Sequence, residues 1–185
     1  MIEDIKKDAE QRMRKTVTST RDSMARIRTG RATTALLDHL SVNYYGSQVP
    51  INQVATVSVA DARTLTVQPW EKQMLEVVEK AILESDLGLN PMTAGEVMRI
   101  PLPAMTEERR VELSRVVRQE GENGKVAIRN IRRDAIHTVR ELLKEKEITQ
   151  DEEKGMESTL QTLTDQYIQE IAGVVEEKQN EVMDV

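Results

Sequence analysis

The stretch PLPAMTEERRVELSRV, residues 101–116, marks the point where the pattern of the sequence changes. Pro101 and Pro103 form a short stiff link, because proline fixes its φ angle and has no backbone donor. Thr106 follows as a candidate N-cap, and two glutamates come directly after it, where the positive end of a helix dipole favours acidic side chains. The sequence therefore predicts that a helix begins here.

Downstream of this point, apolar residues recur at spacings of three and four up to about Lys144. They are Leu113, Val117, Ile128, Ile131, Ala135, Val139 and Leu142. At 1.5 Å per residue, such a helix would be roughly 60 Å long. Gly121 and Gly124 fall on or near the apolar stripe. We expect them to weaken the helix locally, the alternative being close approach of a neighbouring helix.

Two further amphipathic helices are predicted, one near each end of the chain. Thr149 and Glu152 match a capping box that opens the later helix. Residues 2–28 form the earlier one, with Gly30 as a candidate stop signal. Their stripes are Met156, Leu160, Leu163, Tyr167, Ile171 and Val174, and Ile2, Ile5, Ala9, Met13, Val17, Met24 and Ile27. Since an amphipathic helix cannot bury its apolar face alone, we expect the three helices to pack together.

Upstream of the prolines, residues 31–104 have a different pattern. Val, Thr and Tyr alternate with polar residues through 40–68, a helical spacing returns at 71–85, and EVMRI at 96–100 is typical of one more strand. The predicted fold class is α+β: a long three-helix bundle from residues 1–30 and 105–185, into which 31–104 is inserted as a small β/α domain. The chain crosses between the two parts twice, and we expect these crossings to form a hinge. The hinge residues are Arg28, Thr29, Gly30 and Arg31, together with Pro101, Leu102 and Pro103.

The composition excludes several classes of protein. Of the 185 residues, 31% are charged and only 2% are aromatic, which suits a thin core between long helices. The chain has no cysteine, in keeping with a reducing cytoplasm, which is the predicted location. The N-terminal residues alternate in charge and no apolar run approaches about 18 residues, so we expect neither a secretory signal nor a membrane span.

Catalytic and metal-binding patterns are also missing from the sequence. The histidines are His39 and His137 only, neither with a nucleophile or a metal-ligand partner at a suitable spacing. The glycine-containing stretches lack the lysine and serine of a phosphate-binding loop. We therefore expect a protein that is not an enzyme and that needs no cofactor.

Charge is distributed unevenly along a chain of net charge −6. Residues 149–185 carry 2 basic and 10 acidic residues, whereas residues 1–30 carry 8 basic and 5 acidic ones. On the long central helix, one side gathers basic residues within an arc of about 100°. This basic arc consists of Lys125, Arg129, Arg132, Arg133 and Arg140. The acidic residue nearest to the basic arc is Glu122, at the N-terminal edge of the arc. Asp134 lies on the opposite side of the helix.

Three guanidinium groups within five residues repel one another unless they meet an anion, and arginine is suited to bidentate contact with phosphate. We therefore interpret Arg129, Arg132 and Arg133 as an anion-binding group. In the first helix, Lys7, Arg14, Arg21 and Arg28 recur every seven residues. For Lys7 and Arg14, an ordinary solvated surface or ion pairs with the acidic third helix is the favoured interpretation. Because the helix offers no exposed aromatic rings, the predicted mode is backbone and shape recognition of folded RNA.

Several stretches resemble the bacterial-type ribosome recycling factor family. They are RTGRA at 28–32, VQPWE at 67–71, GLNP at 88–91, PLPAMTEERR at 101–110 and IRNIRRDA at 128–135, in order along essentially the whole chain. The resemblance implies an L-shaped protein with a helical bundle and a smaller domain on a hinge. It implies binding to large-subunit ribosomal RNA through Arg132, with Arg129 and Arg133 beside it. We predict Lys125 of the basic arc and Arg28 of the first helix as further RNA contacts.

The family's activity follows translation termination. The resemblance implies that, with elongation factor G and GTP, the chain separates the ribosomal subunits so that messenger RNA and deacylated transfer RNA leave. It is expected to act as a monomer in the cytoplasm. Two alternatives stay open at this point: a structural coiled-coil protein that dimerises through its long helices, and an enzyme whose active site lies within 31–104.

Overall fold

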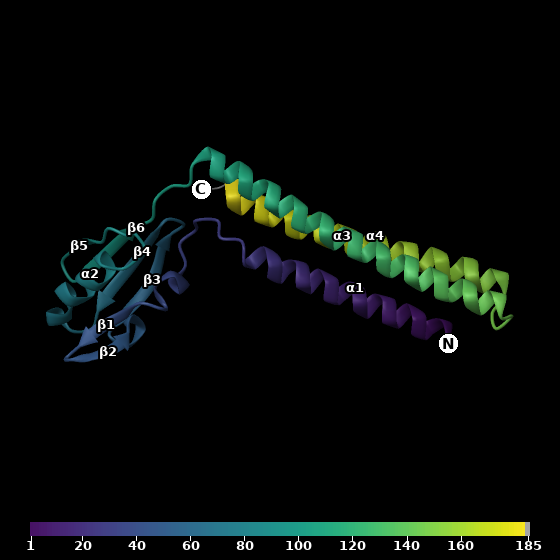
Figure 1. The fold of residues 1–185 in the computed structure, drawn as a ribbon, viewed down its shortest axis with the longest axis horizontal. Coiled ribbons are helices and arrows are strands. Elements are labelled where there is room, and N and C mark those ends of the chain that lie inside the picture. The colour runs from purple at the N-terminus through teal and green to yellow at the C-terminus, as the bar shows by residue number, and fades with distance from the viewer. Residues whose placement is uncertain (184–185) are drawn as a thin grey trace. The chain divides into compact units, whose positions relative to one another are not determined.

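A computed structural model describes residues 1–183 and divides into two compact units. Within the described residues, one unit consists of Met1–Arg28 and residues 108–183, and the other of Thr29–Glu107. The first, the bundle, holds the helices α1 (Ile2–Ala25), α3 (Glu107–Lys144) and α4 (Gln150–Met183), which run side by side (Figure 1). The second, the inserted unit, holds all six strands described and the helix α2 (Leu75–Leu83).

Each helix of the bundle buries most of the apolar stripe that its sequence predicts, although Ile27 lies beyond α1 and Leu142 is half-buried. The core takes Ala9, Met13 and Val17 from α1, Ile128, Ile131, Ala135 and Val139 from α3, and Met156, Leu160, Leu163, Tyr167 and Ile171 from α4. At the start of α4, the Thr149 hydroxyl accepts a hydrogen bond from the Glu152 backbone N–H at 3.2 Å, as expected of a capping residue. Helix α1 ends at Ala25, earlier than the predicted residue 28, and Gly30 (φ +74°) lies in the following link.

The two glycines of α3 mark a close helix approach, and the expectation of a locally weak helix is wrong. Helix α3 continues through both positions, and both are buried. A Cβ atom at Gly124 would lie 2.6 Å from the Thr20 hydroxyl of α1 and 3.0 Å from Ile171 Cδ1 of α4. One at Gly121 would collide with the side chain of Val175. Packing against two neighbouring helices therefore offsets the low helix propensity of glycine.

The inserted unit is built on two antiparallel sheets. Strands β3 (Ala55–Asp61), β4 (Thr64–Pro69), β5 (Met92–Ala94) and β6 (Val97–Pro101) form a four-stranded sheet in the order β3-β4-β6-β5, and β1 (Ser41–Tyr44) pairs with β2 (Ser47–Pro50). Its core includes Leu65, Val67, Met98 and Ile100 from facing positions of β4 and β6, and Val78 and Ile82 from α2. The predicted α+β class, with a small β/α part inserted into a helical bundle, is confirmed.

Polar contacts fix the periphery of the inserted unit. The hydroxyls of Tyr44 and Tyr45 donate to the two oxygens of the Glu71 carboxylate, at 3.0 and 2.9 Å. These hydrogen bonds raise the pKa of both phenols, because a nearby carboxylate disfavours the phenolate. The Trp70 indole N–H donates to Thr56 at 2.8 Å, and the residue is 62% exposed. Tyr45 and Trp70 are thus hydrogen-bonded at the surface of the unit, and Tyr44 packs partly against its core.

Both crossings lie beside the turn that joins β3 to β4. The Ala32 N–H donates to the Ala62 carbonyl at 2.8 Å, and the Leu102 N–H donates to the Arg63 carbonyl at 2.7 Å. The two segments also meet directly, since a Cβ at Gly30 would lie 3.0 Å from Met105 Cγ. Pro101 is the last residue of β6. In the second crossing, which joins β6 to α3, the residues without regular secondary structure are therefore 102–106.

Candidate nucleic-acid interface

The five cations of the basic arc have different surroundings. Arg129 is exposed and makes no ion pair or hydrogen bond with any residue between 1 and 183 that the structure describes. Arg132 is half-buried, and its Nη1 donates to the side-chain oxygen of Gln161 on α4 at 3.0 Å. Thus one arginine of the arc is unconstrained and its neighbour one turn on is held by a neutral partner.

The other three cations are paired with carboxylates. Arg140 meets Glu157 at 2.9 Å and Glu153 at 3.9 Å, both on α4. Arg133 lies 3.5 Å from Asp134, the next residue in the chain. The expectation of a largely unbalanced arc is therefore wrong for Arg133 and Arg140. A carboxylate beside an arginine lowers the local positive potential, and the net worth of such exposed pairs is small.

Lys125 lies beside the acidic residue that the sequence predicts to be nearest to the basic arc. Its amino group lies 3.7 Å from Glu122, the acid that the helical wheel places nearest to the arc, and its side chain is 24% exposed. Asp134, predicted to face away from the arc, also lies 3.8 Å from Arg12 of α1. The positive charge available to an anion is therefore concentrated at Arg129 and Arg132, with Arg133 beside them.

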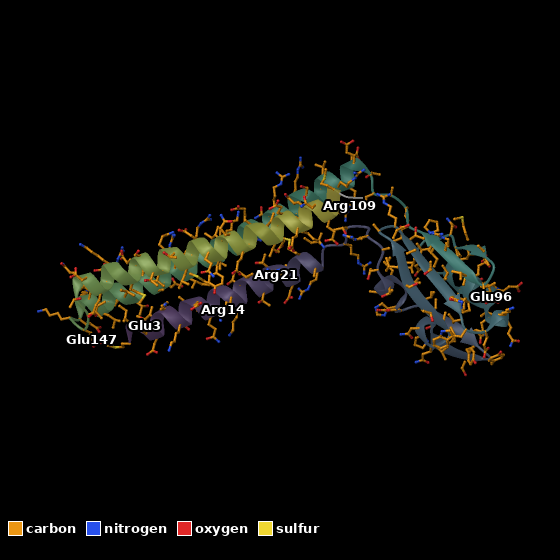
Figure 2. All side chains as sticks on the ribbon, turned by 180° about the vertical axis from the view of Figure 1, so that it is seen from behind. Glu3, Arg14, Arg21, Glu96, Arg109 and Glu147 are labelled. Atoms are coloured by element: carbon orange, nitrogen blue, oxygen red, sulfur yellow. The ribbon has the colours of Figure 1, made fainter. Side chains whose placement is uncertain are left out.

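The basic residues of α1 lie along a second surface. Arg14 and Arg21 are on the same side of this helix (Figure 2), and Arg28 is exposed in the link that follows it. Arg14 is engaged within the bundle: its Nε donates to the Tyr167 hydroxyl at 3.1 Å and its Nη2 meets Glu10 at 3.0 Å. The hydrogen bond to Tyr167, and then the nearby charges, raise the pKa of Arg14. It serves in part to join α1 to α4.

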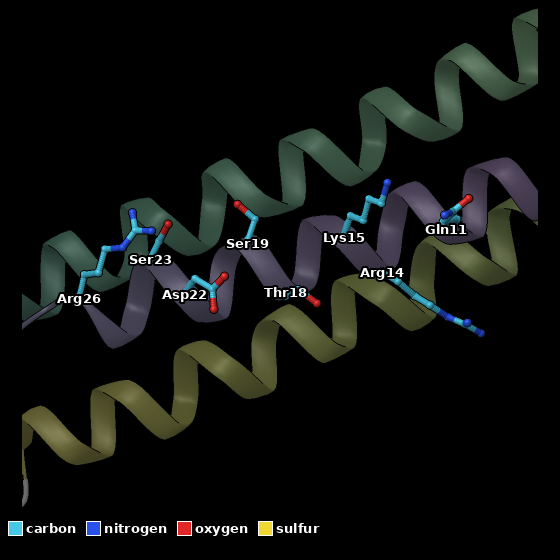
Figure 3. Close-up of a pocket in the computed structure, with 8 residues that line it drawn as sticks. All are labelled: Gln11, Arg14, Lys15, Thr18, Ser19, Asp22, Ser23 and Arg26. Atoms are coloured by element: carbon cyan, nitrogen blue, oxygen red, sulfur yellow. The ribbon is translucent and has the colours of Figure 1, made fainter.

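The outer face of α1 forms a shallow hollow of about 370 Å³ (Figure 3). Its side chains are polar, and they diverge: Arg14 points toward α4, whereas Lys15 and Ser19 point toward α3. Lys15 and Ser19 also line a groove between α1 and α3 that reaches Gly124. These positions are not suited to convergent binding of a small molecule, because few polar groups aim at a common point.

Among residues 1–183, no group of three or more His, Asp or Glu side chains could hold a metal ion. Across the same residues, no helix is long and apolar enough to cross a membrane.

The fold and this surface define a two-unit α+β protein in which a three-helix bundle presents exposed arginines on its central helix. A profile of the family described as ribosome recycling factor matches residues 20–183. The ribosome-recycling factor of Thioalkalivibrio sulfidiphilus is 58% identical over 185 residues, which cover 100% of both chains. That of Nitrosococcus oceani is 55% identical over 100% of this chain and 99% of its own. The chain therefore belongs to the ribosome recycling factor family.

Solved structures agree with this assignment. A solution structure of the ribosome recycling factor is 43% identical, with a TM-score of 0.65 over 100% of this chain and 98% of that one. A second match, 44% identical with a TM-score of 0.60 over 98% of both chains, is described as models for the T. thermophilus ribosome recycling factor and the E. coli elongation factor G bound to the E. coli post-termination complex.

Proposed function

We propose that this chain binds post-termination ribosomes and, with elongation factor G and GTP, promotes separation of the subunits and release of messenger RNA and deacylated transfer RNA. Family membership over essentially the full chain supports this function. So does the similarity to a recycling factor described together with elongation factor G on a post-termination complex. We place the activity in the cytoplasm, where translating ribosomes are. The chain itself is proposed to catalyse no reaction and to need no cofactor.

The observation that carries the RNA-binding part is the group of arginines on one exposed side of α3. We propose that Arg129, Arg132 and Arg133, with Lys125 at the edge, contact phosphates of large-subunit ribosomal RNA. Arg28 is proposed as an additional contact from the link that follows α1. Arginine forms charge-assisted and often bidentate hydrogen bonds with phosphate, which fits recognition of a folded RNA backbone.

The inserted unit is proposed to do the work that depends on elongation factor G. Residues 31–105 carry 5 basic and 8 acidic residues and contain no cluster comparable to the basic arc. We propose that the two crossings, Arg28–Arg31 and Pro101–Pro103, act as a hinge that lets the inserted unit be displaced while the bundle stays bound. Pro101 ends β6 and the Leu102 N–H is bonded to the β3–β4 turn, so these two residues stay with the inserted unit. Bending would then fall at Pro103 and the residues up to 106 in the second crossing, and before Ala32 in the first.

The alternative of a dimeric coiled coil has less support. The apolar stripes of all three helices are buried against one another within a single chain. A coiled-coil seam between two chains would need a further apolar stripe, and the exposed apolar residues of α3 are scattered singly: Val111, Val116 and Val126.

The test compares two arginines of the same arc. Arg132→Ala should weaken binding to post-termination ribosomes by about 1.5–3 kcal/mol, the scale of a hydrogen bond to a charged group. Arg140→Ala serves as the matched control and should cost less than about 1 kcal/mol, because Glu157 and Glu153 already engage that side chain. Co-sedimentation gives the affinity, and light scattering with elongation factor G and GTP gives the splitting rate. Failure of the unaltered chain to split ribosomes would overturn the proposal.

A further inference from the structure

A chain of hydrogen bonds runs from α4 to the central arginine of the arc. The Gln161 side-chain amide donates from Nε2 to Asp165 Oδ1 at 2.9 Å, and its Oε1 accepts from Arg132 Nη1 at 3.0 Å. Asp165 lies one helical turn after Gln161, so both side chains lie on the same side of α4. We call this arrangement the Asp165–Gln161–Arg132 relay.

The carboxylate determines which way the amide points. An amide side chain has one acceptor end and one donor end, and an ionised carboxylate only accepts. If the Gln161 amide were reversed, its oxygen would face the Asp165 carboxylate and its N–H groups would face the guanidinium, so both hydrogen bonds would be lost. Asp165 therefore directs the Gln161 oxygen at Arg132, and the donor and acceptor roles in the relay are consistent.

The relay leaves the phosphate-binding part of Arg132 available. A guanidinium has five N–H donors, and the Gln161 contact uses one of those on Nη1. The Nε and Nη2 donors, which together can form a fork, make no hydrogen bond with any residue in the described range 1–183. Such a fork matches two oxygens of a phosphate. Arg132 is thus held at one edge while another edge stays free.

Arg132 differs from the other arginines of the arc because its hydrogen-bond partner, Gln161, carries no charge. Arg140 is held by two carboxylates, which offset its charge, whereas Arg129 has its full charge but no partner among residues 1–183 that would fix its position. Arg132 combines a fixed orientation with an uncompensated charge. Holding a long side chain in its binding conformation reduces the rotamer entropy that is lost on association.

We propose that Gln161, oriented by Asp165, is a positioning residue that holds Arg132 ready for an RNA phosphate; this inference rests on the proposed function. Gln161→Ala should weaken binding to post-termination ribosomes by about threefold to tenfold, since Arg132 keeps its charge and loses only its orientation. Gln161→Glu should weaken binding more than Gln161→Ala, because the new carboxylate would offset the charge of Arg132 as Glu157 offsets that of Arg140.

The experiment is a double-mutant cycle on ribosome affinity with Gln161→Ala, Arg132→Ala and the pair. Gln166→Ala is the matched control, because Gln166 is an exposed glutamine of the same helix whose side chain makes no hydrogen bond with any residue between 1 and 183. We expect the pair to bind no more weakly than Arg132→Ala alone and Gln166→Ala to bind normally. Alanine favours helix, so α4 should be retained, and circular dichroism checks this.

Salt dependence separates positioning from a direct contact. Gln161→Ala should leave the slope of log affinity against log salt unchanged, whereas Arg132→Ala should reduce its magnitude by about 0.7–0.9, the value for one phosphate contact. Normal affinity of Gln161→Ala, or an equal loss in the Arg132→Ala background, would overturn the relay while leaving the proposed function intact. Normal affinity of Arg132→Ala would instead contradict the proposed RNA contact, and the relay with it.

Discussion

The bundle and the inserted unit achieve stability in different ways. The bundle joins residues far apart in the sequence: Arg14 of α1 donates to Tyr167 of α4, and its core takes residues from all three helices. The inserted unit closes over a short span, with neighbouring strands pairing in register and Tyr44 and Tyr45 held by Glu71. The bundle therefore has a long polar surface, whereas the inserted unit is compact and has a smaller surface.

This difference suggests a division of labour based on charge. Residues 106–148, most of which form α3, carry 11 basic and 9 acidic residues, and acidic residues exceed basic ones by three in 31–105. A long helix spreads its cations over many phosphates, whereas the inserted unit offers no comparable row. We therefore expect affinity for RNA to depend on the bundle, and splitting to depend on both units.

The largest effect is expected from removing the inserted unit. Replacing residues 31–104 with a short Gly/Ser linker should abolish subunit splitting while ribosome binding is retained, because the basic arc is untouched. Loop closure adds little cost, since its entropy grows only with the logarithm of length. Light scattering with elongation factor G and GTP measures splitting, and co-sedimentation measures binding. Circular dichroism must first show that the shortened chain is helical; splitting at the normal rate would contradict the division of labour.

Salt should weaken the binding of the full chain and of the shortened chain alike. If four cations of the bundle each release one counterion, affinity should fall by about 80-fold between 50 and 200 mM salt, from a slope of about −0.8 per contact. Equal slopes for the two chains would assign the phosphate contacts to the bundle. A clearly smaller slope after the deletion would place some of these contacts in the inserted unit.

Glycine has a spatial role in the bundle, and Gly121→Ala tests it. Alanine normally stabilises a helix by about 1 kcal/mol relative to glycine. Here we expect a loss of about 1–3 kcal/mol in the free energy of unfolding, because the new Cβ collides with Val175. Urea unfolding measures the change. Adding Val175→Ala should cost less than the sum of the two single changes, and a stabilising Gly121→Ala would contradict the close approach.

Glycine has a conformational role in the inserted unit, where the smallest effect is expected. Gly95 joins β5 to β6 with φ +66°, and no atom lies within 4 Å of where its Cβ would be. Gly95→Ala should therefore cost about 1 kcal/mol through backbone strain alone. Gly95→Asn should cost less, since asparagine tolerates this conformation better. Equal stability of the alanine and glycine forms in urea would show that the turn relaxes.

Much of the fold follows from residue spacing, because burial requires it. The stripes of the three long helices predicted α1, α3 and α4, and the alternation through residues 40–68 predicted strands in the region of β1 to β4. The spacing in 71–85 predicted α2 and EVMRI at 96–100 predicted β6, whereas the short strand β5 was not predicted. The role of Gly121 and Gly124 was not predictable in this way. A buried glycine has the same sequence signal whether it weakens a helix or admits a neighbour, and only the positions of Thr20 and Val175 decide between the two.

The candidate interface was predictable in position but not in detail. A helical wheel places Arg129, Arg132 and Arg133 on one side of α3, since that depends on one helix alone. Whether Arg140 meets Glu157, or Arg132 meets Gln161, depends on the rotation and axial shift of α4 against α3. No repeat within either helix encodes that relation. The spacing of Gln161 and Asp165 by four residues was the one local signal of the relay.

Helix α1 is far along the sequence from the helices that it packs against, and this distance matters while the chain is being synthesised. Helix α1 is complete at Ala25, but the first α3 residue of the shared core is Ile128. At 5–20 residues per second, a ribosome needs about 5–20 s to make the intervening segment. Throughout that time the apolar stripe of α1 has no native partner, while the inserted unit, contiguous in the chain, can already fold. Newly made α1 is therefore the part of this chain most exposed to chaperones and proteases before the bundle closes.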